Sequence, residues 1–259
     1  MATLLNATGD TAAAMLVARF TEGKDWMKPP PLRENYSIFN KGLLYWRINK
    51  PFTTCMLHIL YIIAIIAEAM TAALSAGRRD MDWVGVCIIA WVTALGGGTV
   101  RNILFNHYPM SWVEHPEYLV ITAAAAILAA IIARLMTKMK TLFLYLDALG
   151  LVVFTIIGCQ IAEQIDLPWL IILLSGMITG CAGGVLRDVL CNEVPLLFRK
   201  EVYASASIVT GACYLSLEHL GAPNSATIVI ACIIGLALRL LSIRYNWQMP
   251  KFVYREEWH

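Results

Sequence analysis

Charged residues are scarce in this chain of 259 residues. Only 15% of its residues are Asp, Glu, Lys or Arg, whereas 59% are hydrophobic and the mean hydropathy is +0.64. Because about a quarter of the residues in a soluble domain are charged, this composition indicates a membrane protein that works in a lipid bilayer. The net charge of +2 is small and dispersed, which excludes the basic stripe that nucleic-acid binding requires.

Catalytic and metal-binding motifs are missing as well. The sequence contains no GxSxG, HExxH or Walker loop and no paired carboxylates on a polar face, so nothing in it predicts an enzyme. The seven cysteines are well separated, form no CxxC pair and lie in apolar or near-apolar runs. This pattern is typical of small buried side chains rather than of zinc ligands or disulfides. We therefore expect no cofactor and no metal centre.

Long apolar runs fill most of the chain. A hydrocarbon core about 30 Å thick requires about 20 helical residues per crossing, and residues 1–50 contain no run of that length. Because their apolar run is short and lacks a basic segment before it, we expect no cleavable signal peptide there. We expect this N-terminal extension to be either an interfacial helix with a proline-rich linker or a partly disordered tail. Seven transmembrane helices are predicted after it, at residues 52–76, 83–105, 117–136, 141–162, 168–190, 200–219 and 224–243.

One glycine-rich stretch occurs twice, 86 residues apart. The first copy, from Thr93 to Asn102, reads TALGGGTVRN, and the second, from Thr179 to Asp188, reads TGCAGGVLRD. Identities that include Gly, Pro, Trp and Arg at one offset indicate an internal duplication. The identical pairs are Thr93 and Thr179, Gly97 and Gly183, Gly98 and Gly184, Arg101 and Arg187, Trp83 and Trp169, Leu104 and Leu190, Asn106 and Asn192, and Pro109 and Pro195.

The repeat spans three predicted helices. Because three is an odd number, the second copy enters the membrane from the opposite side, so we predict two inverted three-helix repeats, at 51–140 and 141–221. A seventh helix, at 222–244, lies outside this symmetry and precedes a C-terminal tail at 245–259. The predicted fold class is therefore an all-α membrane protein.

Basic residues in the connections predict the orientation. By the positive-inside rule the side that carries most of them is cytoplasmic, which places the N-terminus outside and the C-terminus inside. Three basic residues just before the first helix oppose this orientation. The residues on the predicted cytoplasmic side are Arg78, Arg79, Arg134, Lys138, Lys140, Arg199, Lys200, Arg244, Lys251 and Arg255, and the opposing residues are Lys41, Arg47 and Lys50.

Glycines interrupt the second and the fifth predicted crossing. Backbone groups freed inside a bilayer must face protein or water, so we predict that both helices are broken at these glycines, beside a polar cavity. The alternative is that the glycines allow close helix packing. The predicted pore-hinge residues are Gly96, Gly97, Gly98, Gly183 and Gly184, and the predicted cavity hydroxyls are those of Thr93, Thr99 and Thr179.

Arg101 and Arg187 follow the last glycine of each copy by three residues. A charge at this depth faces a water-filled path or a partner, although each side chain could instead extend to the nearer interface. Asp188 follows Arg187, whereas the neutral Asn102 follows Arg101, so the two half-sites differ in charge. We expect Arg101, Arg187 and Asp188, together with Glu68 of the first predicted crossing, to line or gate a pore.

Glu68 is another charge inside a predicted crossing, and it needs a partner from a different helix. Arg101 is our first candidate for that partner, and a cation site at Glu68 is the alternative. Asp147, Gln160 and His58 are interpreted as interfacial or satisfied polar residues.

Several of these segments closely resemble the duplicated domain of the prokaryotic TRIC (trimeric intracellular cation channel) family, a domain also labelled a glycine transporter. The resemblance covers about residues 55–243. The matching segments are Asp82–Val86, Thr93–Arg101, Gly183–Leu190, Asn192–Pro195 and Arg199–Tyr203.

The resemblance implies a homotrimer in a prokaryotic inner (plasma) membrane. Each subunit would have seven helices and its own potassium-permeable pore, lined by the second and fifth helices, with K⁺ or Na⁺ as the transported ion. From this resemblance we predict a potassium-preferring monovalent-cation channel. Three residues depart from the family pattern: Asn102, Ala182 and Glu68 stand where the family usually has Asp, Gly and an apolar residue. A secondary transporter of a small solute such as glycine is the alternative, and a structural or assembly subunit is a third possibility.

Overall fold

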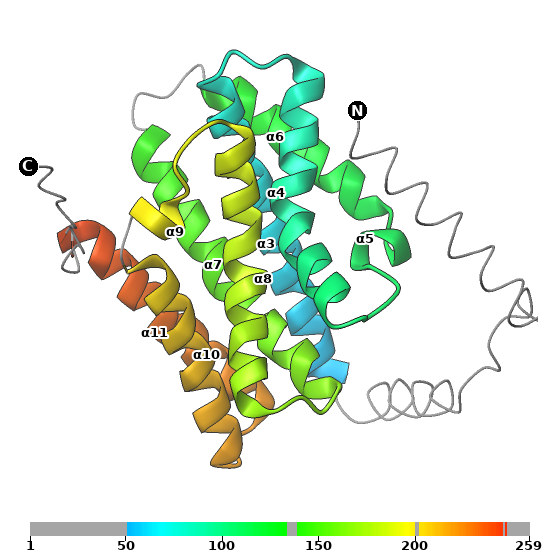
Figure 1. Ribbon diagram of the computed structural model, residues 1–259, viewed down its shortest axis with the longest axis vertical. Helices are drawn as coiled ribbons and strands as arrows, with labels where there is room; N and C mark the ends of the chain where they lie inside the picture. Colours follow the sequence, from blue (N-terminus) through cyan, green and yellow to red (C-terminus); the bar gives the residue numbers. More distant parts are fainter. Residues whose placement is uncertain (1–50, 134–138, 200–201, 246, 248–259) are drawn as a thin grey trace, which may run out of the picture. The chain divides into compact units, whose positions relative to one another are not determined.

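The computed structural model describes residues 51–133, 139–199, 202–245 and 247. The predicted N-terminal extension and most of the predicted C-terminal tail lie outside these residues. All regular structure in the described residues is helical (Figure 1). The longer helices are α3 (Pro51–Gly77), α4 (Trp83–Leu104), α6 (Glu117–Ala133), α7 (Met139–Gln164), α8 (Trp169–Leu190), α10 (Tyr203–His219) and α11 (Asn224–Tyr245), and the short ones are α5 (Ser111–Glu114) and α9 (Leu196–Arg199).

Five of the described helices, α3, α4, α7, α8 and α11, are long and apolar enough to cross a membrane. The chain is therefore a multi-pass membrane protein, as its composition predicts. Helix α6 is apolar but only 17 residues long. Helix α10 also has 17 residues, and it carries serine, threonine and glutamate side chains. Crossings by α6 and α10 stay predictions.

Helices α4 and α8 lie side by side in the middle of the bundle (Figure 1). Helix α4 also packs against α6, and α8 also packs against α7 and α10, while α11 covers α7 and α10. Helix α3 joins the core through a face of small residues with at most 2% exposure, which allows neighbouring backbones to approach closely. This face consists of Ala64, Ala69, Ala72, Ala73 and Ala76.

The duplication seen in the sequence reappears in the backbone at the helix ends. Among the described non-glycine residues, those with positive φ are Asp80 and Asp166, and Asn106 and Asn192, with φ between 52° and 54°. The members of each pair are 86 residues apart, and each residue follows the end of a long helix. Asp and Asn tolerate the left-handed conformation that commonly ends a helix.

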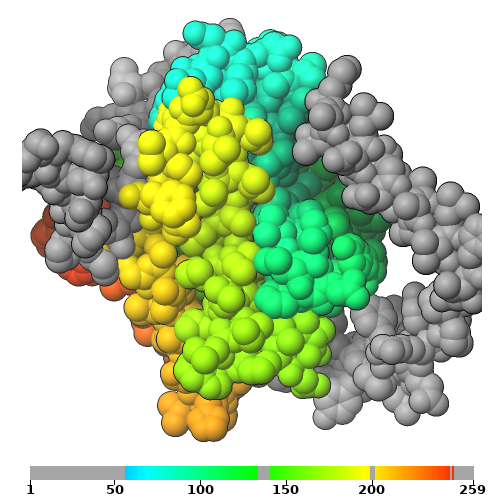
Figure 2. Space-filling model, in the orientation of Figure 1, coloured from blue at the N-terminus to red at the C-terminus, as the bar shows by residue number. Residues whose placement is uncertain are grey.

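Two contacts show which connections share an end of the bundle. The Arg79 guanidinium, after α3, donates to the carbonyl oxygen of Asn192, after α8, at 3.0 Å, and these two connections adjoin in Figure 2. The Tyr118 hydroxyl of α6 lies 3.4 Å from Nδ1 of His58, near the start of α3. The end of α3 is thus level with the end of α8, and its start is level with the start of α6.

Candidate functional site

The two glycine motifs face one another where α4 contacts α8. A Cβ atom built on Gly97 would collide with the carbonyl oxygen of Thr179, and one built on Gly183 would collide with the carbonyl oxygen of Thr93. The contact is reciprocal, since each glycine meets the threonine of the other copy. The absence of a side chain at both positions therefore lets the two helices approach this closely.

The predicted breaks at the glycines are wrong. Helix α4 continues through Gly96, Gly97 and Gly98, and α8 continues through Gly183 and Gly184. The physical reason is that a helix satisfies its own backbone groups in lipid, and close packing against the partner helix compensates for the weak helix propensity of glycine. The alternative interpretation, packing through glycine, is the one that the structure supports.

The three predicted cavity threonines donate hydrogen bonds to their own helices. Thr93 and Thr179 are buried at the α4–α8 contact, and their hydroxyls donate to the carbonyl oxygens of Ile89 and Ser175, both at 2.7 Å. The Thr99 hydroxyl donates to its own helix at 2.8 Å and accepts a bond from the indole N–H of Trp112 at 3.1 Å. Their lining of a pore stays a prediction.

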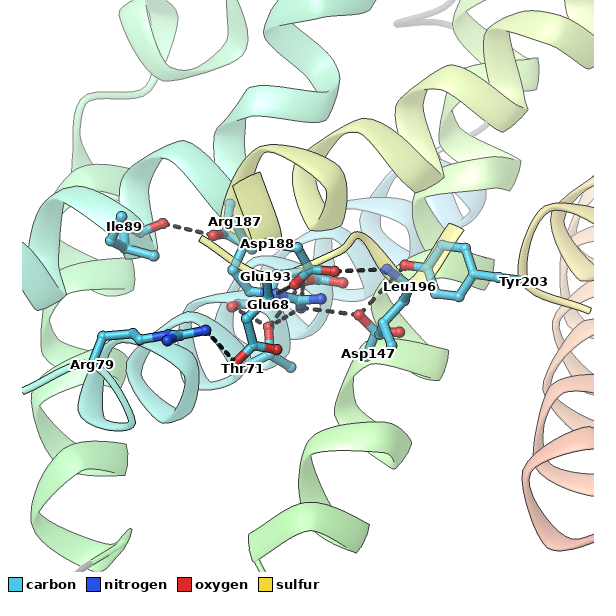
Figure 3. Close-up of polar contacts among 11 residues, drawn as sticks. Glu68, Thr71, Arg79, Ile89, Asp147, Arg187, Asp188, Glu193, Leu196 and Tyr203 are labelled. Atoms are coloured by element: carbon cyan, nitrogen blue, oxygen red, sulfur yellow. Dashed lines mark hydrogen bonds and ion pairs between the residues drawn. The ribbon is translucent and has the colours of Figure 1, made fainter. Parts of the chain in front are cut away.

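Arg187 lies at the centre of a buried ion cluster (Figure 3). Its Nε donates to Oδ1 of Asp188 at 2.8 Å, and its Nη1 donates to Oδ1 of Asp147 at 3.0 Å. The same Nη1 lies 3.7 Å from Oε2 of Glu68 and donates to the Thr71 hydroxyl at 2.9 Å. The Arg187 side chain is fully buried, so these contacts take the place of water around Nε and Nη1, whereas Nη2 has no hydrogen-bond partner among the described residues.

A second layer of contacts holds the carboxylates of this cluster. The backbone N–H of Leu196 in α9 donates to Oδ2 of Asp188 at 2.8 Å, and the Tyr203 hydroxyl of α10 lies 3.4 Å from Oδ1 of Asp147. The Arg239 guanidinium of α11 stacks on the Tyr203 ring, 4.7 Å from its centroid. Side chains and backbone from α3, α7, α8, α9 and α10 therefore converge on one guanidinium.

Arg101 has a different environment, although it occupies the same place in the first copy. Its Nε and Nη2 both donate to Oδ1 of the neighbouring Asn102, at 3.0 and 2.7 Å. Tyr61 of α3 lies close enough to interact with it electrostatically. Among the described residues no carboxylate lies within ion-pair distance of Arg101, which is only 2% exposed. Burial, and next the Arg101 charge, lower the pKa of His107, which follows α4.

The predicted pairing of Glu68 with Arg101 is wrong, because Glu68 lies beside Arg187. The reason is the direction of the helices. Helices α3 and α8 end at the same end of the bundle, so a residue late in α3 is level with one late in α8. Helix α4 ends at the opposite end, which removes Arg101 from the reach of Glu68. Extension of either arginine to an interface is also excluded, since both guanidinium groups are buried.

Sequence reasoning missed Asp147, Thr71 and Tyr203 as members of the cluster. Asp147 is completely buried and makes a direct ion pair with Arg187. Its position inside an apolar helix was the available signal, because an acidic residue within a crossing usually has a charged partner. Thr71 and Tyr203 gave no such signal. His58 contacts Tyr118, and Gln160 is largely buried.

A buried guanidinium held by carboxylates, beside a close-packed helix pair in a multi-pass helical protein, is a feature of membrane channels and transporters. Comparison with known proteins narrows this class. The sequence model of the family described as "Glycine transporter" matches the chain twice, over residues 58–134 and 144–219. The UPF0126 inner membrane protein YadS of Escherichia coli K12 is 34% identical over 203 residues, which are 78% of this chain and 98% of that protein.

Solved structures give the same assignment. The TRIC trimeric intracellular cation channel orthologue from Rhodobacter sphaeroides aligns with a TM-score of 0.72 and 29% identity, over 74% of this chain and 99% of that one. A second TRIC cation channel aligns with a TM-score of 0.71 and 30% identity, over 77% and 98% of the two chains. The chain belongs to the TRIC channel family, as its motifs predicted. It is not an enzyme, and it is a protein of the inner membrane.

Proposed function

We propose that this protein is a passive, potassium-preferring channel for monovalent cations, and that it forms a homotrimer with one pore in each subunit. The observation that carries the proposal is the Arg187 cluster beside the α4–α8 glycine contact. Three carboxylates surround one guanidinium there, so the positive charge that would oppose cation passage is more than neutralised. The similarity to TRIC cation channels supports the same function.

The pore would run between α4 and α8. In the present arrangement the backbones of the two helices touch at Gly97 and Gly183, so this path is closed, and conduction requires that the helices separate or bend there. A motion of α8 would also move Arg187 away from Glu68 of α3 and Asp147 of α7. The glycines and the ion cluster together would then act as the gate.

The duplicated helices would be inserted in opposite directions. The reciprocal contacts of Gly97 with Thr179 and of Gly183 with Thr93 support this arrangement, because a two-fold axis in the membrane plane produces such a pair of contacts. Arg79 shares its end of the bundle with the connection after α8, and the positive-inside rule makes this end cytoplasmic. The N-terminus would then lie outside and the C-terminus inside.

Single-channel recording of the purified protein in planar bilayers tests the proposal. We expect unitary current steps in symmetric KCl, and a reversal potential under a K⁺/Na⁺ gradient that shows preference for K⁺. Steps that are absent in protein-containing bilayers, or that reverse at the chloride potential, would contradict a cation channel.

A secondary transporter of a small solute such as glycine is the second candidate. Arg101 favours it, because this buried guanidinium has no carboxylate within ion-pair distance among the described residues and could accept the carboxylate of an amino acid. The description of the family's sequence model points to the same class. Saturable glycine uptake into proteoliposomes, without unitary current steps, would favour this function over a channel.

A further inference from the structure

The Arg187 cluster contains more negative than positive charge. Glu68, Asp147 and Asp188 surround a single guanidinium, and their side chains are at most 6% exposed. The Arg239 guanidinium stacks on the Tyr203 ring, and within the described part of the chain its Nε and Nη2 have no hydrogen-bond partner. Unpaired negative charge away from water is very costly, so this arrangement favours a bound proton on one of the carboxylates.

The contacts indicate which carboxylate carries that proton. Asp188 accepts two bonds from N–H donors at 2.8 Å, and Asp147 accepts one from Arg187 at 3.0 Å. Glu68 lies 3.7 Å from Nη1 of Arg187, which is beyond hydrogen-bonding distance. Its carboxyl group also faces Gly150 of α7, where a Cβ atom would collide with Oε1. Oδ2 of Asp147 has no hydrogen-bond partner among the described residues, but its Oδ1 is bonded to the guanidinium, so Glu68 has the weakest contact with positive charge of the three.

The hydroxyl of Thr71 is a suitable partner for a proton on Glu68. Its oxygen lies 2.8 Å from the Glu68 carbonyl oxygen and 3.1 Å from Oε2 of Glu68, and it accepts a bond from Arg187. A hydroxyl has only one proton, which can go to the carbonyl, to Oε2 or to both in a three-centre bond. A protonated Oε2 that donates to Thr71 fits the contact at 3.1 Å and leaves the hydroxyl proton to the shorter contact with the carbonyl.

We propose that Glu68 is a proton-binding site, occupied in this arrangement, and that loss of the proton makes Glu68 compete with Asp147 for Arg187. The neutral acid donates to Thr71 and leaves Nη1 of Arg187 to Asp147. The anion has no proton to donate, so it attracts the guanidinium towards α3. Among the described residues, the charged and titratable groups that face Glu68 are Asp147 of α7, Cys181, Arg187 and Asp188 of α8 and Tyr203 of α10, with Arg239 of α11 behind Tyr203.

Infrared difference spectroscopy of the full-length protein in lipid tests the site directly. At neutral pH we expect the carbonyl stretch of a protonated carboxylic acid, shifted by deuterium exchange and lost in Glu68→Gln. The matched control is Glu117→Gln, which removes an exposed carboxylate at the other end of the bundle and should leave that band unchanged. A band that persists in full in Glu68→Gln would overturn the proposal.

A second measurement needs no variant. Titration of the wild-type protein to alkaline pH should abolish the protonated-carboxyl band, and the absence of any such band at neutral pH would overturn the proposal. The thermal midpoint adds a further check, because Gln resembles the protonated acid. Glu68→Gln should unfold at the wild-type temperature at neutral pH, whereas a marked decrease would indicate an ionised Glu68 in an ion pair.

The consequence for transport rests on the proposed channel function. If α8 moves with Arg187, potassium flux through the wild-type protein should change with pH over the range in which the infrared band disappears, and Glu68→Gln should lose that pH dependence. Flux with the same pH dependence in Glu68→Gln would overturn the competition for Arg187. A wild-type protein without flux at any pH would contradict the channel, while the infrared result would still decide the proton site.

Discussion

Arg101 and Arg187 occupy equivalent places in the two copies of the repeat, yet their surroundings differ in charge. Both follow a glycine motif, both are buried, and both bond through Nε to the next residue in the chain. Every acidic neighbour of Arg187 has a neutral counterpart 86 residues away. Asp188 corresponds to Asn102, Asp147 to Tyr61 and Glu68 to Phe154.

The comparison shows that duplication has preserved the backbone and the arginine while the partners have diverged. The Arg187 half-site is a locked ion cluster, whereas Arg101 has neutral polar partners. We infer that the Arg187 half is the gate, and that the Arg101 guanidinium, which has no carboxylate partner among the described residues, is the one that can bind an anionic solute. Four predictions test this difference, and they are arranged from the largest expected effect to the smallest.

Replacing each arginine by glutamine should give the largest difference in stability between the two half-sites. Arg187→Gln leaves three buried carboxylates without their guanidinium, and removal of one partner from a buried ion pair costs about 3–5 kcal/mol. Arg101→Gln loses hydrogen bonds to a single neutral acceptor, for which we expect about 1–3 kcal/mol. Equilibrium unfolding in mixed micelles measures both values. Equal losses for the two variants would contradict the difference between the half-sites.

Adding a methyl group at the glycine contact should lower the stability of the protein by a similar amount in either copy of the motif. Gly97→Ala and Gly183→Ala each place a Cβ against the backbone of the facing helix, and overpacking of this kind costs about 1–3 kcal/mol. Because α4 and α8 could no longer close fully, basal potassium flux into proteoliposomes should rise.

Gly77→Ala is the matched control for these variants, since nothing lies within 4 Å of a Cβ at Gly77. It should keep both the wild-type stability and the wild-type flux. Unchanged stability in Gly97→Ala would show that α4 and α8 do not pack through this glycine.

Giving Arg101 an acidic partner should make the two half-sites more alike. In Asn102→Asp the neutral acceptor of two N–H groups becomes a carboxylate, and hydrogen bonds to charged groups are stronger by about 1 kcal/mol. We expect a gain in unfolding free energy of about that size. We also expect that added free glycine stabilises this variant less than it stabilises the wild-type protein. A decrease in stability would indicate that Arg101 already has a counter-charge.

The exposed ion pair at the end of the bundle should contribute least to the unfolding free energy. The Arg79 guanidinium lies 3.5 Å from Oε1 of Glu193, and both side chains reach solvent. Exposed ion pairs are worth about 0–1 kcal/mol, and Arg79 also donates to the Asn192 carbonyl oxygen. Arg79→Ala should therefore lower the unfolding free energy by no more than about 1 kcal/mol in the same assay. A loss as large as that of Arg187→Gln would mean that this connection is part of the gate.

The sequence predicted the periodic and repeated features of the protein, whereas it did not predict the contacts between helices. The apolar runs predicted the long helices to within a few residues, and the offset of 86 predicted the shared motif that the structure places at one helix contact. The predicted breaks were wrong because glycine has two uses in a membrane helix, bending and close packing. The continuous helices, and the close contacts of Gly97 with Thr179 and of Gly183 with Thr93, distinguish the two uses.

The partner of Glu68 could not be predicted for a related reason. The sequence identified a buried carboxylate that needed a cation, and two arginines were available at similar depth in their helices. The choice depended on which helices end level with one another, a property of the bundle rather than of any segment. Asp147 was interpreted as an interfacial or satisfied polar residue, and its ion pair with Arg187 was not predicted for the same reason, since that pair depends on where α7 meets α8.

By itself, the sequence determined that this protein is a helical membrane protein built from a duplicated unit, with an arginine three residues after the last glycine of the motif in each copy. Hydrophobicity and internal repetition act along the chain, so they can be read there. The tertiary structure decided that the glycines close the central helix pair, and that three carboxylates gather on Arg187 whereas none from the described part of the chain reaches Arg101. These outcomes depend on which side chains of neighbouring helices lie at the same level along the bundle axis, and the packing of the helices determines that level.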